Sequence, residues 1–393
     1  MAILNKIFSC LPVFILLYSS TLHVNACYTS IVSFGDSLAD TGNLKQFVTN
    51  SKSEPPHFLF LPYGETFFHK ATGRCSNGRL IIDFIAESLG MHILPYEKMK
   101  MNNAMKIDQG VNFAVVGATA LDSSFFEARG VNNPYTNASL NVQLQSFKKV
   151  FASICMTNSD CKNLLGSSLI LMGEIGGNDY NHPIIAGKPY DELISYVPLV
   201  INTIISAINE LIELGAQTLV VPGNLPIGCS TTYLTIYHGS DKVKYDNTTG
   251  CLVELNKFAE YHNELLQTEL HHIRELHPNV NIIYADYYNA AMQFYHYPLK
   301  YGFTNGALKA CCGGGGPYNY NMLVACADPS STTCDQPETY ANWDGLHLTE
   351  TAYHVIYKSL FQGTYTTPHF NSLCPASTIS QDIFTSSSLV QSF

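Results

Sequence analysis

The stretch Ile31-Val32-Ser33-Phe34-Gly35-Asp36-Ser37-Leu38 holds the feature on which the fold prediction rests, a short apolar run that ends at a glycine and an aspartate. Runs of this length and composition are typical of buried strands. Similar runs recur along the chain and alternate with longer segments of helical period. That alternation is typical of a parallel sheet covered by helices on both faces, so we predict one α/β domain.

Four strands and three helices stand out most clearly. The strands are rich in β-forming residues, are closed by Gly, Pro or Asp, and are expected at residues 28–34, 168–172, 218–221 and 280–285. The helices stop at Gly90, at Gly215 and before Pro278, and are expected at residues 80–89, 191–214 and 252–276. Pro198 is a point where the second helix could kink.

The two ends of the chain differ from its middle. Lys6, the apolar residues 7–18 and Val24-Asn25-Ala26 have the layout of a secretory signal that is cleaved before Cys27. An uncleaved anchor is the alternative. Residues 371–393 are rich in Ser and Thr and lack periodicity, which predicts a tail. The expected division is therefore a signal peptide at 1–26, one domain at 27–370 and a C-terminal tail at 371–393.

The balance of charges is acidic. The chain has 31 Asp and Glu against 21 Lys and Arg, a net charge of −10, and one of those basic residues, Lys6, lies in the expected signal. We expect no nucleic-acid partner, because phosphate groups need a positive surface. The apolar leader run is far below the ~20 residues of a membrane span, and no other segment is expected to compete, so we also expect no stable membrane insertion.

Disulfides are expected among the twelve cysteines, eleven of which follow the expected cleavage site. Cys311 and Cys312 should pair elsewhere than with each other, because neighbouring Cα atoms lie only about 3.8 Å apart. A zinc site is the alternative for the cysteine cluster, but no Cys-x-x-Cys or His-x-x-x-His spacing accompanies it. Connectivity does not follow from sequence; the short-range candidates are Cys155/Cys161, Cys229/Cys251 and Cys326/Cys334.

Two tripeptides match the acceptor pattern for N-linked glycosylation. They are Asn137-Ala138-Ser139 and Asn247-Thr248-Thr249. Both agree with passage through the secretory pathway, although such tripeptides also arise by chance. Asn137 and Asn247 are therefore the candidate glycosylation sites.

Ser37 is the candidate nucleophile. In open α/β sheets ligands bind beyond the carboxyl ends of strands, and Ser37 follows the strand at 28–34. A serine placed where a strand turns into a helix exposes its hydroxyl and has its N–H near a positive helix end. A helix-capping serine is the alternative role.

A serine nucleophile needs a base, and that base needs a group that fixes its tautomer. Asp344-Gly345-Leu346-His347 places a carboxylate three residues before an imidazole, just ahead of a helix expected to begin near Thr349. One loop could therefore deliver both groups, with His347 as the base and Asp344 as its partner. The alternative is a capping aspartate beside a surface histidine.

Acyl transfer also needs donors aimed at the oxyanion. Asn178, in the segment after the strand at 168–172, offers a side-chain amide, and Gly117 offers a backbone N–H that no side chain obstructs. The Ser37 N–H would be a third donor. Turn-forming roles for the glycine and the asparagine are the alternatives.

Taken together, four blocks of sequence resemble the plant GDSL esterase/lipase family within the SGNH hydrolases. The resemblance runs from about Ile31 to the region of Phe361. The blocks are Phe34-Gly35-Asp36-Ser37-Leu38-Ala39-Asp40-Thr41-Gly42-Asn43, Gly110-Val111-Asn112-Phe113-Ala114-Val115-Val116-Gly117-Ala118, Gly173-Glu174-Ile175-Gly176-Gly177-Asn178-Asp179-Tyr180 and Asp344-Gly345-Leu346-His347-Leu348-Thr349.

The resemblance implies a flavodoxin-like fold, a three-layer α/β/α sandwich with a parallel sheet. It also implies that Ser37, Gly117, Asn178 and His347 are the signature residues, with Asp344 orienting His347. Val116 stands where many plant members have a glycine. Residues 73–79 and the cysteine-rich residues 311–334 are similar to the branch that contains acetylajmalan esterase and sinapine esterase.

We therefore expect a secreted serine esterase that hydrolyses carboxylic esters through a Ser37 acyl-enzyme. An acyltransferase that uses the same acyl-enzyme and a secreted glycoprotein that binds a ligand without turnover are the alternatives. No metal or organic cofactor is implied, because the chain has no His-Glu-x-x-His, no Walker loop and no Gly-x-Gly-x-x-Gly after a strand. The oligomeric state and the final compartment, apoplast or vacuole, are left open.

The expected partner is a small-molecule ester of a specialised metabolite, an acetyl or aryl ester such as that of an alkaloid. No helix has an apolar stripe set apart from the core pattern, as action on a lipid surface usually requires. The 24 Tyr and 21 Phe could line a pocket, and the acidic balance favours approach of a cationic ester.

Overall fold

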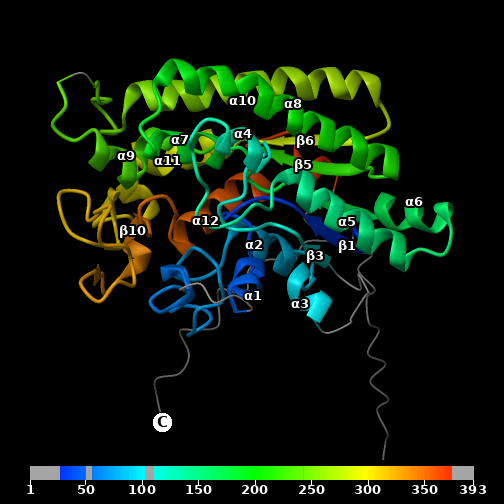
Figure 1. The fold of residues 1–393 in the computed structure, drawn as a ribbon, viewed down its shortest axis with the longest axis horizontal. Helices are drawn as coiled ribbons and strands as arrows, with labels where there is room; N and C mark the ends of the chain where they lie inside the picture. Colours follow the sequence, from blue (N-terminus) through cyan, green and yellow to red (C-terminus); the bar gives the residue numbers. More distant parts are fainter. Residues whose placement is uncertain (1–26, 50–54, 102–109, 242, 374–393) are drawn as a thin grey trace, which may run out of the picture.

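The fold was analysed in a computed structural model that describes residues 27–49, 55–101, 110–241 and 243–373 (Figure 1). The expected signal peptide and residues 374–393 of the expected tail lie outside the described residues. The last described helix, α13 (Phe370–Leu373), crosses the expected tail boundary at 370/371. Its Phe370 is buried and its ring lies 4.5 Å from that of Phe361.

A seven-stranded sheet forms the centre of the molecule. Its strand order is β11-β6-β5-β4-β1-β3-β2, and all pairs are parallel except β11 with β6. In chain order the strands are β1 (Ser30–Ser33), β2 (Leu94–Pro95), β3 (Gly110–Asn112), β4 (Ser168–Leu171), β5 (Thr218–Pro222), β6 (Asn281–Ala285) and β11 (Thr366–Thr367).

The inner part of this sheet, β3-β1-β4-β5-β6, has the flavodoxin-like order in which the second strand in sequence lies on one side of the first and the others follow on the opposite side. The prediction of an α/β fold with a flavodoxin-like parallel sheet is confirmed. The antiparallel edge strand β11 and the short edge strand β2 were not predicted, because two-residue strands carry no readable pattern.

Helices cover both faces of the sheet. In chain order they are α1 (Asn43–Thr49), α2 (Ile81–Ser88), α3 (Tyr96–Met101), α4 (Ser123–Glu127), α5 (Leu140–Ile154), α6 (Asn158–Gly166), α7 (Asn178–Ile185), α8 (Tyr190–Leu214), α9 (Thr231–Ile236), α10 (Val253–Leu276), α11 (Tyr287–His296), α12 (Glu350–Tyr357) and α13. Two small sheets lie outside the main one and pair β7 (Gly306–Ala310) with β10 (Tyr340–Asn342) and β8 (Cys312–Gly313) with β9 (Thr332–Thr333).

Side chains alternate between two hydrophobic cores along each strand. In β4, Ile170 belongs to the core beneath α5, α8 and α10, whereas Leu169 and Leu171 belong to the core beneath α2, α11 and α12. Successive side chains of a strand point to opposite faces, so an uninterrupted apolar run is buried on both. Figure 1 shows α8 and α10 side by side over one face of the sheet.

The clearest predictions from sequence match the structure within about two residues at each end. The four expected strands correspond to β1, β4, β5 and β6, and the three expected helices to α2, α8 and α10. Gly215 adopts a φ of 116° directly after α8, a conformation that favours glycine, so this stop signal acts as expected. Thr349 caps α12, because its hydroxyl accepts a hydrogen bond from the Ala352 N–H.

The expectation that no segment competes with a membrane span was wrong for α8. By length and composition alone, its 25 residues would suffice to cross a membrane. The helix also carries a buried stripe that includes Leu193, Val197, Val200 and Ile204, and it packs against α5, α7 and α10. A long core helix has the same composition, which is why the sequence alone did not distinguish the two.

Two of the three predicted disulfides are confirmed, namely Cys155–Cys161 and Cys229–Cys251. The predicted Cys326/Cys334 pair was wrong. Cys326 bonds to Cys312 and Cys334 bonds to Cys311. The short spacing between Cys326 and Cys334 suggested the wrong pair, because each of them bonds instead to one of the neighbouring Cys311 and Cys312, which, as expected, are not bonded to each other.

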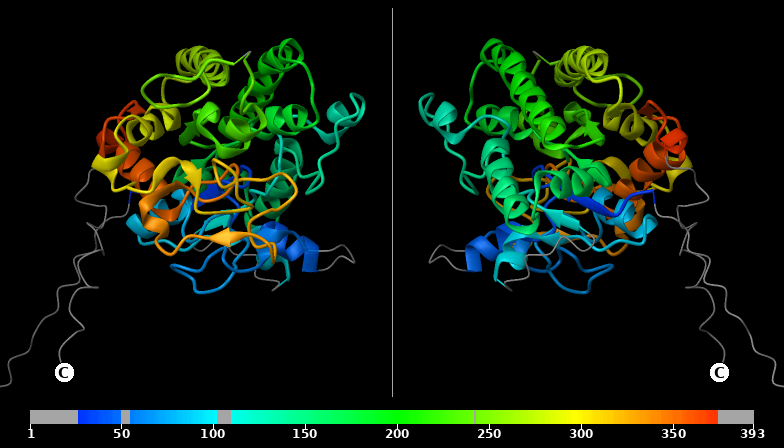
Figure 2. Two further views of the ribbon diagram at one scale, coloured as in Figure 1. Left: turned by 90° about the vertical axis from the view of Figure 1, so that its left-hand side faces the viewer. Right: turned by 90° about the vertical axis from the view of Figure 1, so that its right-hand side faces the viewer.

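The loops at one end of the molecule come from distant parts of the chain. Residues 55–79 (blue) and the cysteine-rich residues 311–345 (orange) lie side by side there in Figures 1 and 2. The Ser76 hydroxyl donates to the Leu348 carbonyl, and Arg79 forms an ion pair with Glu350. These contacts bring the first quarter of the chain against its last fifth.

Candidate active site

The candidate residues gather where the strand order of the sheet changes direction. Ser37 follows β1, and Asn178 begins α7 shortly after β4, the neighbour of β1. This is the switch point at which open α/β sheets bind ligands, because the connections from the two strands run to opposite sides. The third segment, residues 344–347, follows β10 and belongs to no strand of the main sheet.

Ser37 lies in a single turn rather than at the start of a helix. The N–H groups of Ala39 and Asp40 both donate to the Asp36 carbonyl, and α1 begins only at Asn43. The expectation of a direct strand-to-helix junction is thus corrected by about one turn. Asp40 makes the connection, because its carboxylate accepts from the N–H groups of Gly42, Asn43 and Leu44 and so caps α1.

A chain of hydrogen bonds links the three expected catalytic residues. The Ser37 Oγ lies 2.9 Å from the His347 Nε2, and the His347 Nδ1 lies 2.8 Å from the Asp344 Oδ2. Ser37 and Asp344 are buried, and the His347 side chain is 15% exposed. In this geometry the ring can take a proton from the serine at one nitrogen while the carboxylate holds the other.

The charges of Asp344 and His347 in this series of hydrogen bonds stabilise each other. Burial opposes the charge on His347, but the Asp344 carboxylate and the Cys75 thiol raise the pKa of His347 well above its usual value. Burial likewise opposes the charge on Asp344, yet the histidine and backbone N–H groups lower the pKa of Asp344 below its usual value. Asp344 therefore stays a carboxylate in the working pH range.

Hydrogen bonds within the loop from Asp344 to His347 hold its backbone in one conformation. The Asp344 Oδ1 accepts from the N–H groups of Leu346 and His347, at 2.9 and 2.8 Å, and the Trp343 N–H donates to the His347 carbonyl. A Cβ at Gly345 would lie 2.3 Å from the Tyr320 ring, so only glycine fits there. The alternative of a capping aspartate beside a surface histidine does not describe this loop.

Asn178 is held tightly before any substrate is present. It is the first residue of α7, and its Nδ2 donates to the Asp36 Oδ2 and to the Ala118 carbonyl, both at 3.0 Å. Both hydrogens of the amide are therefore engaged. Donation to an oxyanion requires that Asn178 share or release one of these bonds.

The other two expected oxyanion donors are backbone groups. Among the described residues, no hydrogen-bond acceptor is found for the N–H of Ser37 or of Gly117. Gly117 has a φ of 79°, and a Cβ there would lie 2.9 Å from that of Tyr135, so both conformation and space require glycine. The neighbouring Val116 keeps the backbone in place by donating to Asp40.

A buried pair of carboxyl groups beside the serine was not predicted. Asp36 and Glu174 are 2% and 5% exposed, and the Asp36 N–H donates to the Glu174 carbonyl. Burial and the neighbouring Glu174 raise the pKa of Asp36 well above its usual range, and burial raises that of Glu174. The Asp36 side chain contacts both the turn that carries Ser37 and the Asn178 amide.

A cavity of about 70 Å³ opens beside Ser37, Asn178 and His347. Its apolar wall includes Leu225, Ile227 and Leu346, and its polar wall includes Asn181, Ser230, Tyr233 and Tyr295. Sites that enclose drug-sized ligands usually measure about 300–1,000 Å³. The enclosed part of this site is far smaller, and the rest of a substrate must lie towards the surface.

Possible metal ligands and the two candidate glycosylation sites were also located in the structure. Within the described residues, no group of three or more His, Cys, Asp or Glu could hold a metal ion. Asn137 and Asn247 are both exposed. The hydroxyl of Ser139, the third residue of the first tripeptide, is buried and donates to Asp122.

Sequence reasoning missed several residues that support the site. Asp36 accepts from the Leu38 N–H within its own turn, a role that the local sequence could have indicated, whereas Asp179 accepts from the N–H groups of Ala120 and Leu121, nearly 60 residues away. Gln143 exchanges two hydrogen bonds with the Gly35 backbone, and Tyr63 donates to Asp344. Neither has a signal in its local sequence, because both act across more than 100 residues.

Comparison with known proteins gives concordant results. A family model described as GDSL-like Lipase/Acylhydrolase matches residues 31–360. The Arabidopsis thaliana protein GDSL esterase/lipase At1g28580 is 52% identical over 89% of this chain and 89% of its own length. A second Arabidopsis thaliana protein, GDSL esterase/lipase At1g28600, is 50% identical over 93% of this chain and 92% of its own length.

Among solved structures, a mutant of an acetyl-xylooligosaccharide esterase from Geobacillus matches with a TM-score of 0.31 at 13% identity. The match covers 69% of this chain and 80% of that one.

Proposed function

This chain belongs to the family of GDSL-like lipases and acylhydrolases and is a carboxylic ester hydrolase; from that premise we propose that Ser37, His347 and Asp344 form its catalytic triad. The single observation that supports this assignment best is the unbroken chain of hydrogen bonds from Asp344 through His347 to Ser37. In the proposed mechanism the Ser37 hydroxyl attacks the ester carbonyl and its proton passes to the His347 Nε2.

Asp344 holds the His347 Nδ1–H and stabilises the imidazolium without taking the proton. The negative charge on the carbonyl oxygen is taken up by the N–H groups of Ser37 and Gly117 and by the Asn178 amide. His347 then protonates the leaving alcohol. A water molecule then attacks the acyl-enzyme by the same steps, and the acyl group leaves Ser37 as a carboxylic acid.

We propose a short-acyl ester of a small specialised metabolite as the substrate, an acetyl or aryl ester such as that of an alkaloid. The cavity of about 70 Å³ supports this choice, because an acetyl group fits a small enclosed space and a long acyl chain does not. The Ser230 hydroxyl on the cavity wall has no hydrogen-bond partner among the described residues. It is therefore available to a polar group on the substrate.

Residues 73–79 and 311–334 support the proposal that the chain belongs to the branch that contains acetylajmalan esterase and sinapine esterase. Both segments border the active site in this fold. Ser76 of the first segment donates its hydroxyl to the carbonyl of Leu348, which follows His347, and Cys312 of the second donates its N–H to the Trp343 carbonyl.

The four disulfides that join pairs of described residues fit a protein that matures in the secretory pathway. We propose cleavage of residues 1–26, a single domain that begins at Cys27, and delivery to the apoplast or the vacuole. N-terminal sequencing of the protein from plant tissue should begin at Cys27. Glycosidase treatment of protein from a eukaryotic host should remove mass at Asn137 or Asn247.

The decisive test is a panel of acetyl, cinnamoyl, choline and long-chain esters given to the purified protein. We expect the highest kcat/KM for acetyl and other compact esters, and labelling by a fluorophosphonate probe that the best substrate competes away. Preference for emulsified long-chain lipid would refute the substrate proposal. Analysis of products with an added alcohol distinguishes hydrolysis from acyl transfer, and a protein that the probe does not label would refute the catalytic assignment.

A further inference from the structure

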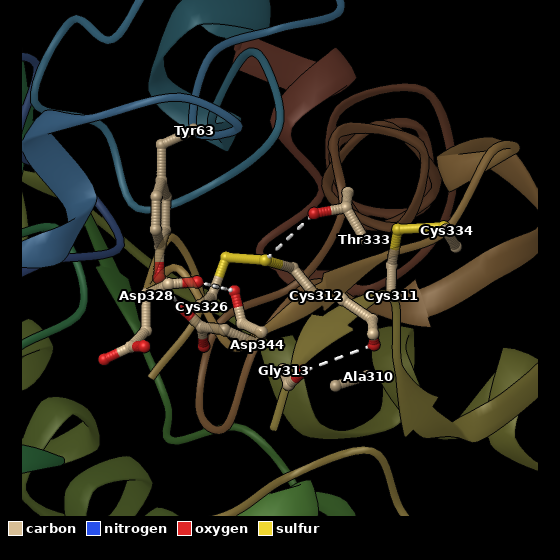
Figure 3. Close-up of a disulfide and its surroundings, with 12 residues drawn as sticks. Tyr63, Ala310, Cys311, Cys312, Gly313, Cys326, Asp328, Thr333, Cys334 and Asp344 are labelled. Atoms are coloured by element: carbon tan, nitrogen blue, oxygen red, sulfur yellow. Dashed lines mark hydrogen bonds between the residues drawn. A yellow bond between two sulfur atoms is a disulfide. The ribbon is translucent and has the colours of Figure 1, made fainter. Parts of the chain in front are cut away.

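Asp344 accepts a hydrogen bond from a tyrosine that lies 281 residues away in the chain. The Tyr63 hydroxyl donates to the Asp344 Oδ2 at 2.8 Å, the same oxygen that lies 2.8 Å from the His347 Nδ1. Figure 3 shows the Tyr63 ring extending from its loop with the hydroxyl pointing at the carboxylate. Both side chains are buried, so water does not compete for this bond.

The tyrosine ring is fixed in this position by its surroundings. Tyr63 lies in the turns that follow a short 3₁₀ helix, η1 (His57–Leu59), and its N–H donates to the Phe60 carbonyl. Its ring contacts Phe58 and Trp343 edge to face, with centroids 6.4 and 5.8 Å away. Trp343 directly precedes Asp344, so the same contact aligns the ring with the acid.

We propose that Tyr63 is a positioning residue for ester hydrolysis, which holds the Asp344 carboxylate in the orientation that His347 requires. This inference rests on the proposed roles of Asp344 and His347. The backbone N–H groups of Leu346 and His347 occupy Oδ1, so Tyr63 is the donor that supports Oδ2, the oxygen closer to His347 Nδ1. Among the described residues, Tyr63 and His347 are the side chains that donate to this buried carboxylate. Without the Tyr63 hydroxyl, His347 would be its one remaining side-chain donor.

The bond also affects how strongly Asp344 attracts a proton. Burial and the adjacent carboxylate raise the pKa of Tyr63 well above its usual value, so the phenol remains a donor throughout the working range. A donor to a carboxylate makes it a weaker base. Tyr63 therefore moderates the attraction of Asp344 for the imidazolium, and losing the bond should make His347 harder to deprotonate.

Several other ionisable groups face the pair and must be considered. They are the buried Cys75 thiol, the phenols of Tyr135, Tyr320 and Tyr353, and the Asp36 carboxyl on the nucleophile side. Among the described residues, none of these groups forms a hydrogen bond to the Asp344 carboxylate. A substitution of Tyr63 that removes one oxygen leaves all five in place.

Tyr63→Phe tests the inference. We expect kcat to fall about tenfold, the size of one hydrogen bond to a charged group, with KM nearly unchanged. The acid limb of kcat/KM should move to higher pH by about half a unit to one unit, because the more basic Asp344 stabilises the imidazolium. The rate of fluorophosphonate labelling should follow kcat/KM at every pH.

Tyr288→Phe is the matched control. The Tyr288 hydroxyl donates to the Glu260 Oε1 at 2.6 Å, so the substitution removes the same oxygen from another tyrosine–carboxylate bond, outside the site. It should leave kcat and the pH profile unchanged. Incorporation of 3-fluorotyrosine at position 63 keeps the ring and strengthens the donor, so it should move the acid limb to lower pH.

A double-mutant comparison separates this inference from the function on which it rests. In an Asp344→Asn background Tyr63→Phe should cost little more, since the two residues act through one bond. If Asp344→Asn alone left kcat intact, the proposed role of Asp344 would fail. If Asp344→Asn were inactive while Tyr63→Phe and the fluorinated protein kept the wild-type kcat and pH profile, only the role of Tyr63 would be overturned.

Discussion

The proposed nucleophile and the proposed acid–base pair sit in two regions that are held together in different ways. Ser37 and Asn178 lie just beyond β1 and β4, two neighbouring strands of the central sheet whose four paired positions run from Ser30 to Ser33. Asp344 and His347 lie in a loop outside that sheet. Their loop is held by the pair β7 and β10, by the disulfide-linked residues 311–334 and by Tyr63.

The two regions, the nucleophile half with Ser37 and Asn178 and the acid–base half with Asp344 and His347, therefore depend on different forces. The position of Ser37 follows from the packing of an apolar strand between two cores, which the rest of the fold requires anyway. The position of His347 follows from a few specific bonds and covalent links. Changes that leave the sheet intact should therefore still damage the acid–base half.

The largest effect is expected when either half loses its reacting group. Ser37→Ala should abolish labelling by an organophosphorus probe and lower kcat by roughly 10⁴–10⁶, and His347→Ala should do the same, because the two groups act as one unit. The double variant should be hardly worse than either single one. Full probe labelling of Ser37→Ala protein would show that another residue is the nucleophile.

Asn178 tests the nucleophile half alone. Asn178→Ala should lower kcat by about 10²–10³, the usual cost of one oxyanion donor. Asn178→Asp should be worse, because it places a carboxylate against the forming oxyanion and beside Asp36. Steady-state kinetics on the best short-acyl ester measures both. A rise in KM at unchanged kcat would instead make Asn178 a binding residue.

Removal of one disulfide tests the acid–base half alone. Cys312 donates its N–H to the Trp343 carbonyl at 2.8 Å, and the Cys312–Cys326 bond lies beside Asp344 in Figure 3. Cys312→Ser with Cys326→Ser should lower the free energy of unfolding by about 3 kcal/mol, as for a loop of about 15 residues, and lower kcat by about tenfold.

The control is the double substitution Cys155→Ser with Cys161→Ser, which opens the disulfide between α5 and α6, away from the site. It should lower stability while kcat stays at the wild-type value. Equal losses of kcat in the two double variants would contradict the idea that the acid–base half depends on its own cross-links.

The smallest effect concerns the buried carboxyl pair on the nucleophile side. The folded-state pKa of Glu174 is raised by burial, so its contribution to stability is present below the unfolded pKa of about 4.3 and is lost as pH rises through the raised value. Glu174→Gln should therefore lose less stability than wild type as pH rises from about 4.3 through the raised value. The difference should be roughly 2 °C in Tm for each unit of pKa shift.

Thermal melts at several pH values measure this difference. Glu275→Gln, which changes an exposed carboxylate on α10, should follow the wild-type curve. A Glu174→Gln curve parallel to wild type across the whole range would mean that Glu174 is not held protonated in the folded protein.

The nucleophile half could be predicted from sequence because its signals are local. The apolar run of β1 and the Gly-Asp-Ser turn adjoin in the chain, and Gly215 and Thr349 end or begin helices through their own conformations. The motif at Asp344 and His347 is equally local. These parts need no knowledge of distant contacts, and periodicity with turn chemistry was enough.

The supporting parts could not be predicted for a physical reason. The bonds from Tyr63 to Asp344 and from Gln143 to Gly35 join residues that only the folded chain brings together. The pairing of Cys326 with Cys312 depends on the path of a loop of which β8 and β9 supply only two residues each. The membrane-like composition of α8 has two physical explanations that sequence alone does not separate.

The distance along the chain between Ser37 and His347, 310 residues, has a consequence for biosynthesis. At about 5–20 residues per second, a ribosome needs roughly 15–60 s to add the residues between them. Throughout that time the emerging chain carries a serine without its base. By the proposed assignment, esterase activity cannot appear before His347 has been added, and a polypeptide truncated before Asp344 should be hydrolytically silent however well its sheet has formed.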